Sequence, residues 1–274
     1  MLWATCVVPA LFPFFVLSKL LIDLGWVTSF SDKIAPITKK LFRAPAISGY
    51  VFAVSILSGY PVGAKMIEES YKKGLLNQTN CKKLATFCST SGPLFILGTV
   101  GAKFFGNAVL GTALFAVHFA SALLTGLCFR NFYTDVNPTK PVALPPRSDV
   151  LNNAVYQSVG SILTVGAFIS LFYMLTDMLL SVYPTTAIPP VVVAFLNGLL
   201  EVTRGCKEVA FSASPQAAFV LCSCLVSFGG LCIFSQSFTY LKNCGVRFRE
   251  FFIIKCVQAA ISTIVAYGVS VFLF

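Results

Sequence analysis

The sequence predicts an all-α, polytopic membrane protein made of two similar halves, each containing broken or re-entrant helices. Three observations lead to this fold class. The 274-residue chain is 57% hydrophobic and 11% charged, with a mean hydropathy of +0.83, whereas a typical soluble domain has about 25% charged residues. Its apolar segments match the length of a membrane span, and the chain has room for roughly six to eight of them. Glycine, proline and serine interrupt two apolar segments in each half.

The first half is assigned to residues 1–130 and begins with an apolar segment, Leu2–Ile22, that predicts a span. This segment has neither the basic leader nor the small-residue cleavage site of a signal peptide. Its abrupt apolar start is typical of a chain that lacks an upstream segment. An amphipathic helix in the membrane interface is predicted at Trp26–Arg43. A short half-helix, Ile47–Ser58, then ends at a Gly-Tyr-Pro break.

A polar helix follows this break, with Pro61 at its first turn. Oppositely charged residues four apart predict ion pairs on helix faces, and these pairs are Lys19–Asp23, Glu68–Lys72 and Glu69–Lys73. The rest of the half is predicted as a turn, a second broken element and a span, at Asn77–Asn80, Leu84–Val100 and Asn107–Phe129.

A polar, proline-rich linker at residues 131–150 separates the halves, and residues 151–274 form the second half. This half is expected to begin with a long apolar helix, Asn153–Tyr183, either continuous or broken near Gly160 or Gly166. The remaining elements are a second half-helix that ends at Glu201, a polar turn, a second broken element, a basic loop and a last span, at Val191–Leu200, Ala210–Gln216, Ala217–Tyr240, Lys242–Glu250 and Phe251–Phe274.

The breaks recur at similar spacing in the two halves. Leu57–Lys65 aligns with Leu199–Lys207 at an offset of 142 residues, with a leucine, a glycine and a lysine in common. Thr90–Ile96 aligns with Ser227–Ile233 at an offset of 137 residues, with a glycine, a leucine and an isoleucine in common. Interrupted helices at matching places in two halves are typical of transporters that bind substrate between the repeats. The breaks leave the number of spans open, and with it whether the repeat is inverted.

Several other classes of function lack the residues they need. The net charge of +10 does not indicate nucleic-acid binding, because the basic residues lie at the ends of apolar segments, as the positive-inside rule expects. The ten cysteines lie in apolar stretches without metal-ligand spacing, so neither a metal site nor a disulfide is predicted. No catalytic motif is present and no cofactor is expected. The single histidine, His118, is interpreted as a hydrogen-bonded packing residue.

The breaks are the candidate substrate site. A helix that starts inside the membrane exposes unpaired N–H groups and the positive end of its dipole, which together favour anions. Ionisable residues at membrane depth are functional candidates, and glycines allow a ligand to approach the backbone. The predicted substrate-binding residues are Ser58, Gly59, Lys65, Ser89, Thr90, Ser91, Gly92, Glu201, Arg204, Ser227, Gly229, Gly230 and Gln236. The alternative is that the small residues only allow close helix packing.

Four strings at these breaks resemble the signatures of a known family. They are SGYPVGAK at Ser58–Lys65, STSGPLFILGTVG at Ser89–Gly101, GLLEVTRG at Gly198–Gly205 and SFGGLCIFSQ at Ser227–Gln236. In this order they look like the YlbJ/SpoVV family of sporulation integral membrane proteins, which have paired nucleoside-recognition (Gate) domains. The resemblance covers nearly the whole chain.

The resemblance implies two Gate-like halves and a fold related to concentrative nucleoside transporters. It also implies a role in endospore formation, in which dipicolinate, a small aromatic dianion, passes from the mother cell across the outer forespore membrane. The chain is shorter than expected for the family. It also has Arg204 in the string EVTRG, where members commonly have asparagine.

We therefore expect an integral membrane transporter of a small anionic aromatic solute, with dipicolinate as the first candidate, in the bacterial cell membrane. Its partners would be that solute, the lipid bilayer and a coupling cation or proton. A nucleoside carrier of the same fold is one alternative. A non-transporting assembly factor for the spore envelope is another.

Overall fold

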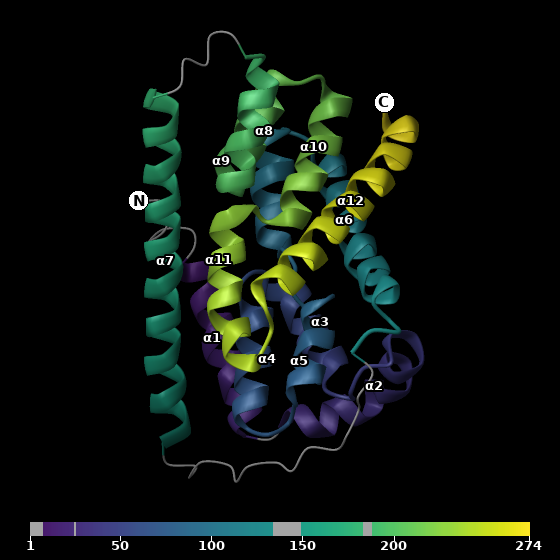
Figure 1. Cartoon of the computed structure of the whole chain (residues 1–274), viewed down its shortest axis with the longest axis vertical. Helices are drawn as coiled ribbons and strands as arrows, with labels where there is room; N and C mark the ends of the chain where they lie inside the picture. Colours follow the sequence, from purple (N-terminus) through teal and green to yellow (C-terminus); the bar gives the residue numbers. More distant parts are fainter. Residues whose placement is uncertain (1–7, 25, 134–148, 183–187) are drawn as a thin grey trace.

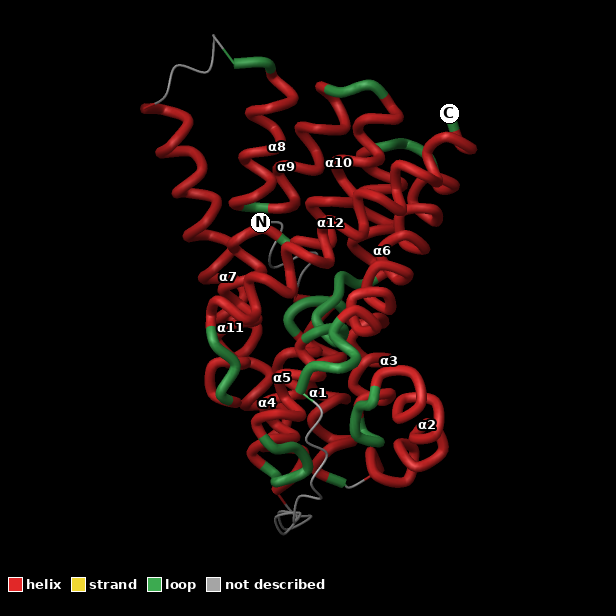
Figure 2. The backbone as a smooth tube through the Cα atoms, turned by 45° about the vertical axis from the view of Figure 1, so that its right-hand side comes forward, coloured by secondary structure: helices red, strands yellow, loops and turns green. Residues whose placement is uncertain are grey.

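The computed structural model describes residues 8–24, 26–133, 149–182 and 188–274. These residues form helices joined by short loops, without a strand among them (Figures 1 and 2). Four of the described helical segments are long and apolar enough to cross a membrane: Ala108–Cys128, Val150–Ser181, Pro215–Cys244 and Phe248–Leu273. The all-α membrane fold predicted from composition is confirmed.

The first half contains seven helices among the described residues. In chain order they are α1 (Val8–Asp23), α2 (Trp26–Phe42), α3 (Ser48–Ser58), α4 (Val62–Lys72), α5 (Gln78–Ala85), the π-helix η2 (Leu94–Phe104) and α6 (Ala108–Cys128). The predicted first span corresponds to α1, and the part of that prediction before Val8 lies outside the described residues.

The described residues of the second half form six further α-helices and one short 3-10 helix. They are α7 (Val150–Val182), α8 (Pro190–Leu200), α9 (Val202–Ser212), α10 (Pro215–Phe228), α11 (Gly230–Leu241), η5 (Lys242–Cys244) and α12 (Phe248–Leu273). Most of the predicted linker between the halves lies outside the described residues.

The helices α3 and α4 form a re-entrant pair with a break at residues 58–60, which we name the first tip. Gly59 has a φ of +82°, a backbone conformation that favours glycine and ends α3. Beyond the break, α4 turns back against α3. A Cβ on Gly63 would lie 2.5 Å from Ser55 Oγ and 1.9 Å from the carbonyl oxygen of Cys88, so this position accepts no side chain without movement.

The helices α8 and α9 form a second, tighter re-entrant pair, with a break at residues 201–203 that we name the second tip. A Cβ on Gly205 would lie 2.0 Å from the Cα of Gly198. The backbones of the two helices therefore touch at Gly198 and Gly205. This pair enters the molecule from the end opposite to α3 and α4, and both tips lie near the middle (Figure 1).

A second break in each half lies against the tip of the same half. In the first half, a Cβ added to Gly59 would lie 2.5 Å from the backbone nitrogen of Gly92, which precedes η2. In the second half, a Cβ added to Gly230, the first residue of α11, would lie 3.2 Å from the Leu200 carbonyl oxygen and 3.2 Å from the Val202 nitrogen. The same contact thus occurs in both halves, and the opposite entry of the two pairs makes the repeat inverted.

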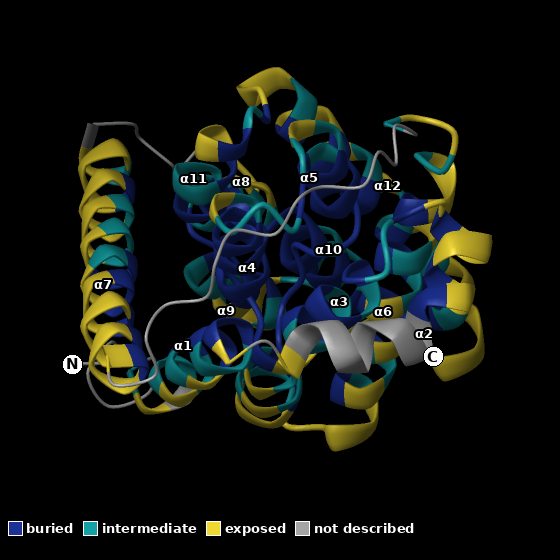
Figure 3. Ribbon diagram, turned by 90° about the horizontal axis from the view of Figure 1, so that it is seen from below, coloured by how far each residue is buried: buried dark blue, intermediate teal, exposed yellow. Residues whose placement is uncertain are grey.

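The long helix α7 lies at the edge of the molecule, packed on α1 (Figure 3). It is continuous, so the predicted alternative of a break near Gly160 or Gly166 is wrong. Its outer face carries exposed apolar side chains, among them Leu163 (57% exposed) and Met178 (57% exposed). Such a face is suited to lipid and unsuited to water.

The two turns predicted from polar residues are wrong in detail. Asn77 is the N-cap of α5 and accepts a hydrogen bond from the Asn80 N–H, so Asn77–Asn80 starts a helix. In the same way α9 continues to Ser212 and α10 starts at Pro215, inside the turn predicted at Ala210–Gln216. Polar side chains there cap helix ends, and the turns between the helices are therefore shorter than the composition suggests.

Basic residues gather at the end of the molecule from which α3 and α4 enter. Arg43 donates to Asn131, Arg130 donates to the Lys40 carbonyl, and Lys82 pairs with Glu250. At this end Lys83 is fully buried. Its Nζ donates to the carbonyl oxygens of Phe129, Arg130 and Phe132 at 2.6–2.8 Å, and it therefore caps the C-terminus of α6 with a positive charge.

We predict that Lys83→Met destabilises the protein by about 2–3 kcal/mol, because three buried carbonyl groups lose their donor. The measurement is the midpoint of thermal unfolding in detergent. Lys82→Met is the matched control, since its part-exposed ion pair with Glu250 should contribute at most about 1 kcal/mol. Equal midpoints for Lys83→Met and the unchanged protein would contradict the capping role.

Candidate functional site

A cavity of about 590 Å³ lies where the tips and breaks of the two halves meet. Its wall includes the first tip, the Ser91–Gly92 break, the second tip and the start of α11. Helices α1 and α7 complete it with apolar side chains such as Leu11, Phe14 and Ile169. The volume is that of a site for one small organic molecule.

Six of the predicted substrate-binding residues line this cavity. Five of them, Ser58, Gly59, Ser91, Gly92 and Glu201, lie at three of the breaks, and the sixth, Gln236, lies on α11 beyond the fourth break. Glycines at the breaks leave the backbone accessible on the cavity side, while hydroxyl, carboxylate and amide groups provide polar contacts. The cavity is thus mostly apolar, with a few polar groups at defined places.

Glu201 is the one carboxylate of this cavity among the described residues, and no lysine or arginine is part of the wall. The side chain is 5% exposed. Its two oxygens accept hydrogen bonds from the backbone N–H groups of Thr203 (3.0 Å) and Arg204 (2.8 Å). The start of α9 therefore stabilises the negative charge of Glu201.

Five further predicted residues hold the breaks together behind the wall. Thr90 Oγ1 lies 2.9 Å from Ser55 Oγ, and Ser227 Oγ lies 2.9 Å from His118 Nδ1. Gly229 has a φ of +90° and faces the Tyr60 ring. The other two are Ser89, which is 4% exposed, and Gly230, which packs on the second tip.

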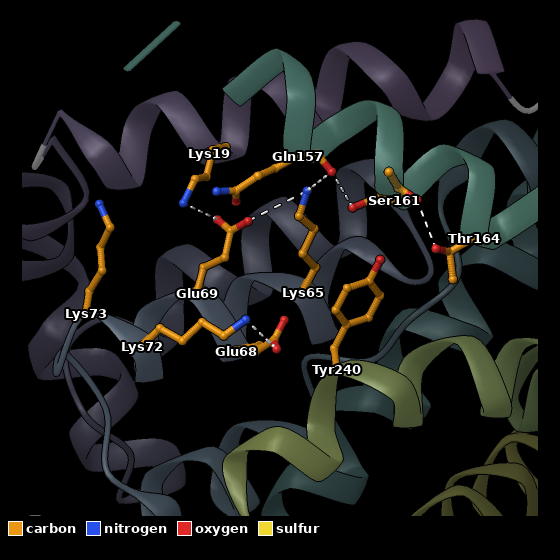
Figure 4. A pocket seen from close by; sticks show the side chains of 11 residues that line it. Lys19, Lys65, Glu68, Glu69, Lys72, Lys73, Gln157, Ser161, Thr164 and Tyr240 are labelled. Atoms are coloured by element: carbon orange, nitrogen blue, oxygen red, sulfur yellow. Dashed lines mark hydrogen bonds and ion pairs between the residues drawn. The ribbon is translucent and has the colours of Figure 1, made fainter. Parts of the chain in front are cut away.

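The two predicted cations lie elsewhere. Arg204 forms ion pairs with Asp177 and with Glu208, the latter at 2.8 Å, on the outer side of α9. Lys65 points into a second cavity of about 480 Å³ between α1, α4, α7 and α11 (Figure 4). Neither residue is part of the wall of the first cavity.

The second cavity contains a network of buried charges (Figure 4). Glu69 lies 3.6 Å from Lys65 and 3.9 Å from Lys19, while Lys73 pairs with Asp23. The predicted pairs Lys19–Asp23 and Glu68–Lys72 are present at 3.3 and 2.7 Å. The predicted pair of Glu69 with Lys73 is wrong, because burial of α4 against α1 brings other partners closer.

Sequence reasoning missed two residues that connect the breaks. Tyr60 belongs to the first tip and lines the cavity. Lys255, on α12, donates to the Tyr60 hydroxyl at 2.6 Å and to the Ser89 carbonyl at 3.2 Å. A lysine at the eighth residue of a membrane span was the signal that could have found it, since such a charge is costly in a bilayer.

His118 is buried and hydrogen-bonded, as predicted, but it also joins the two halves. Its Nε2 accepts from the backbone N–H of Ser91 at 2.9 Å. A backbone N–H can only donate, so Nε2 carries no proton and Nδ1 donates to Ser227 Oγ. The neutral imidazole therefore connects the second break of one half to that of the other.

The described cysteines, nine in number, are free thiols. No group of three or more histidine, cysteine, aspartate or glutamate residues suited to a metal lies within the described part of the chain. Cys6 lies outside it.

No family model matches this chain, but a curated protein and a solved structure resemble it. The chain is 30% identical to the sporulation integral membrane protein YlbJ of Bacillus subtilis (strain 168), over 96% of its own length and 74% of that protein. It also superimposes, with a TM-score of 0.58 and 14% identity, on a solved variant of CNTnw in an outward-facing state, over 100% of this chain and 77% of that one. That protein is a concentrative nucleoside transporter. The second match shows a shared fold.

We predict that Gly205→Ala destabilises the second re-entrant pair by about 1–3 kcal/mol or more, because its Cβ would overlap the backbone of Gly198. The checks are the yield of monodisperse protein and the thermal midpoint in detergent. Gly160→Ala, on α7, is the matched control, because no atom lies within 4 Å of its Cβ position and alanine favours a helix. A Gly205→Ala protein as stable as the control would contradict the backbone contact.

Proposed function

Because the chain belongs to the YlbJ family of sporulation integral membrane proteins, we propose that it carries a small anionic aromatic solute, dipicolinate in the first place, across a bacterial membrane. The observation that carries the proposal is the cavity lined by both tips, by the Ser91–Gly92 break and by the first turns of α11. Unpaired backbone groups at membrane depth are tolerated where they line such a cavity. The transporter-like fold supports the same conclusion.

The cavity suits an aromatic anion in size and surface. Phe14, Tyr60 and Phe95 give it aromatic walls, against which a planar ring can pack. The N-termini of α4, α9 and η2 begin at or near its wall, and helix starts favour negative charge. In this proposal Ser58, Gly59, Ser91, Gly92 and Gln236 contact the solute, and the Glu201 carboxylate, which would repel an anionic group, faces its uncharged edge.

The remaining predicted residues have supporting roles in the proposal. The breaks keep their shape through Ser89, Thr90, Ser227, Gly229 and Gly230. Lys65 and Arg204 lie in separate ion-pair networks, so they act at a distance from the bound solute.

Transport would proceed by alternating access. The two re-entrant pairs enter from opposite ends (Figure 1) and their tips line the cavity, so movement of either tip would open the cavity toward its own side. The basic end around Lys83 and Arg130 would face the cytoplasm by the positive-inside rule. In a sporulating cell the membrane would be the outer forespore membrane, with the basic end in the mother cell.

A nucleoside carrier of the same fold is the second candidate. Glu201 and Gln236 both line the cavity, and a carboxylate and an amide are groups that bind ribose hydroxyls. The likeness to a concentrative nucleoside transporter favours this candidate in fold alone.

We predict that proteoliposomes containing the protein take up labelled dipicolinate, and that unlabelled dipicolinate competes while uridine does not. Empty liposomes provide the control. Uptake of uridine in place of dipicolinate would overturn the anionic substrate and favour the nucleoside carrier.

We also predict that Ser91→Leu reduces uptake at least tenfold without loss of membrane insertion, because the new side chain enters the cavity. Ser181→Leu, at an exposed position of α7, is the control and should leave uptake unchanged. A membrane assembly factor without transport activity would tolerate both changes, so full function of Ser91→Leu in spore formation would support that alternative.

A further inference from the structure

Lys255 lies at membrane depth without an acidic partner. The side chain is 1% exposed, and its Nζ donates to the Tyr60 hydroxyl (2.6 Å), the Gln258 Oε1 (2.6 Å) and the Ser89 carbonyl (3.2 Å). All three acceptors are neutral. Among the described residues, no aspartate or glutamate forms an ion pair with this lysine.

An ammonium group in such a place is expensive. Removing a charge from water is unfavourable unless a neighbouring opposite charge or a change of protonation offsets the lost hydration. Three neutral acceptors satisfy the N–H groups but leave the net charge unbalanced. The charge of Lys255 is therefore favoured when an anion is close and disfavoured when the cavity is empty.

The titratable groups around Lys255 offer no such anion. Facing it are Tyr60 from the first tip and His118 from α6, while Cys256 is its neighbour on α12 and Cys224 of α10 lies beside Cys256. The neutral His118 accepts from the Ser91 N–H and would lose that bond if it gained a proton. The Glu201 carboxylate also lines the cavity, but it belongs to the second tip, accepts from the start of its own helix and forms no ion pair with Lys255. A balancing charge close to Lys255 would therefore come from a bound anion.

The cavity is the nearest place from which it can come. Tyr60 lies between the two, since its ring lines the cavity while its hydroxyl accepts from Lys255. The Nζ of Lys255 is 4.9 Å from the centroid of this ring. An anion bound against Tyr60 would therefore lie only a few ångströms farther from the ammonium group than the ring does. The surroundings have a low dielectric constant, so the attraction would be strong.

We infer that Lys255 is a proton-binding site that is filled together with the substrate site, so that one proton accompanies each anion. This inference rests on the proposed anionic substrate. Substrate binding stabilises the Lys255 ammonium form, which takes one proton from water. Release of the anion returns that proton to water and leaves a neutral amine.

The change of protonation would also alter the contacts of the first tip. As an ammonium group Lys255 donates to the Tyr60 hydroxyl, whose own proton points toward the Ser227 carbonyl, 3.5 Å away. A neutral amine has one lone pair and can accept from Tyr60 instead. Tyr60 would then lose its bond to Ser227, and the first tip would be released from the second half. Ser89 Oγ and Gln258 Nε2 make no hydrogen bond to another described residue and can follow such a change.

The test is calorimetric titration of the purified protein with dipicolinate, in two buffers of different ionisation enthalpy and at several pH values. We expect the unchanged protein to take up a proton on binding, up to one for each dipicolinate. Its affinity should fall by up to tenfold for each pH unit over the range in which free Lys255 is neutral.

Two variants of Lys255 separate the proton from the charge. Lys255→Arg keeps a permanent positive charge, so it should bind dipicolinate without proton uptake and without pH dependence. Lys255→Met removes the charge and should bind about tenfold or more weakly, again without proton uptake. Lys207→Met, at an exposed position of α9, is the control and should behave like the unchanged protein. Thermal midpoints identify a variant that fails to fold.

Each further outcome has a definite reading. Dipicolinate binding to the unchanged protein with no proton uptake would overturn this inference and leave the proposed function intact. Proton uptake retained in Lys255→Met but lost in His118→Asn would overturn it in favour of His118. Absence of any dipicolinate binding would overturn the proposed function itself.

Discussion

The architecture depends on backbone contacts that only glycine permits. Gly59 against Gly92, Gly198 against Gly205, and Gly230 against the second tip each bring main chains closer than a Cβ would allow. These contacts hold the breaks near the middle of the molecule, where four interrupted segments can form one cavity. Because lipid provides no hydrophobic force between helices, such close packing is a main source of helix association in membranes. The substrate site and the stability of the fold therefore rest on the same few residues.

The sequence predicts the membrane fold, the breaks and their pairing well, because long apolar segments and glycine-proline interruptions have a direct physical meaning. It predicts less well where tertiary contacts decide. Four charged residues of α4 look like a solvated face, yet Lys65, Glu68 and Glu69 are buried and pair with residues of other helices as well as their own. The inversion of the repeat became clear only from the directions in which the two re-entrant pairs enter.

The candidate site shows the same division. Residues beside a break were expected at the cavity for reasons of local geometry, and six of them line it. Arg204 and Lys65 were named because they are cations near breaks, and their side chains turn to Glu208 and Glu69 instead. Lys255 and His118 lie far from any break in sequence. Their places depend on how α12 and α6 pack against the breaks, which no local pattern reveals.

The two tips share a geometry but differ in charge. The first tip is neutral and has Lys255 behind Tyr60, an ammonium group when an anion is bound, whereas the second tip presents the Glu201 carboxylate. An electric field therefore runs across the cavity from one half to the other. A solute with one anionic edge would be held with that edge toward the first half. It would keep this orientation when it is released. The two re-entrant pairs thus have tips of similar geometry, while the unequal chemistry of these tips would give a bound molecule a single orientation.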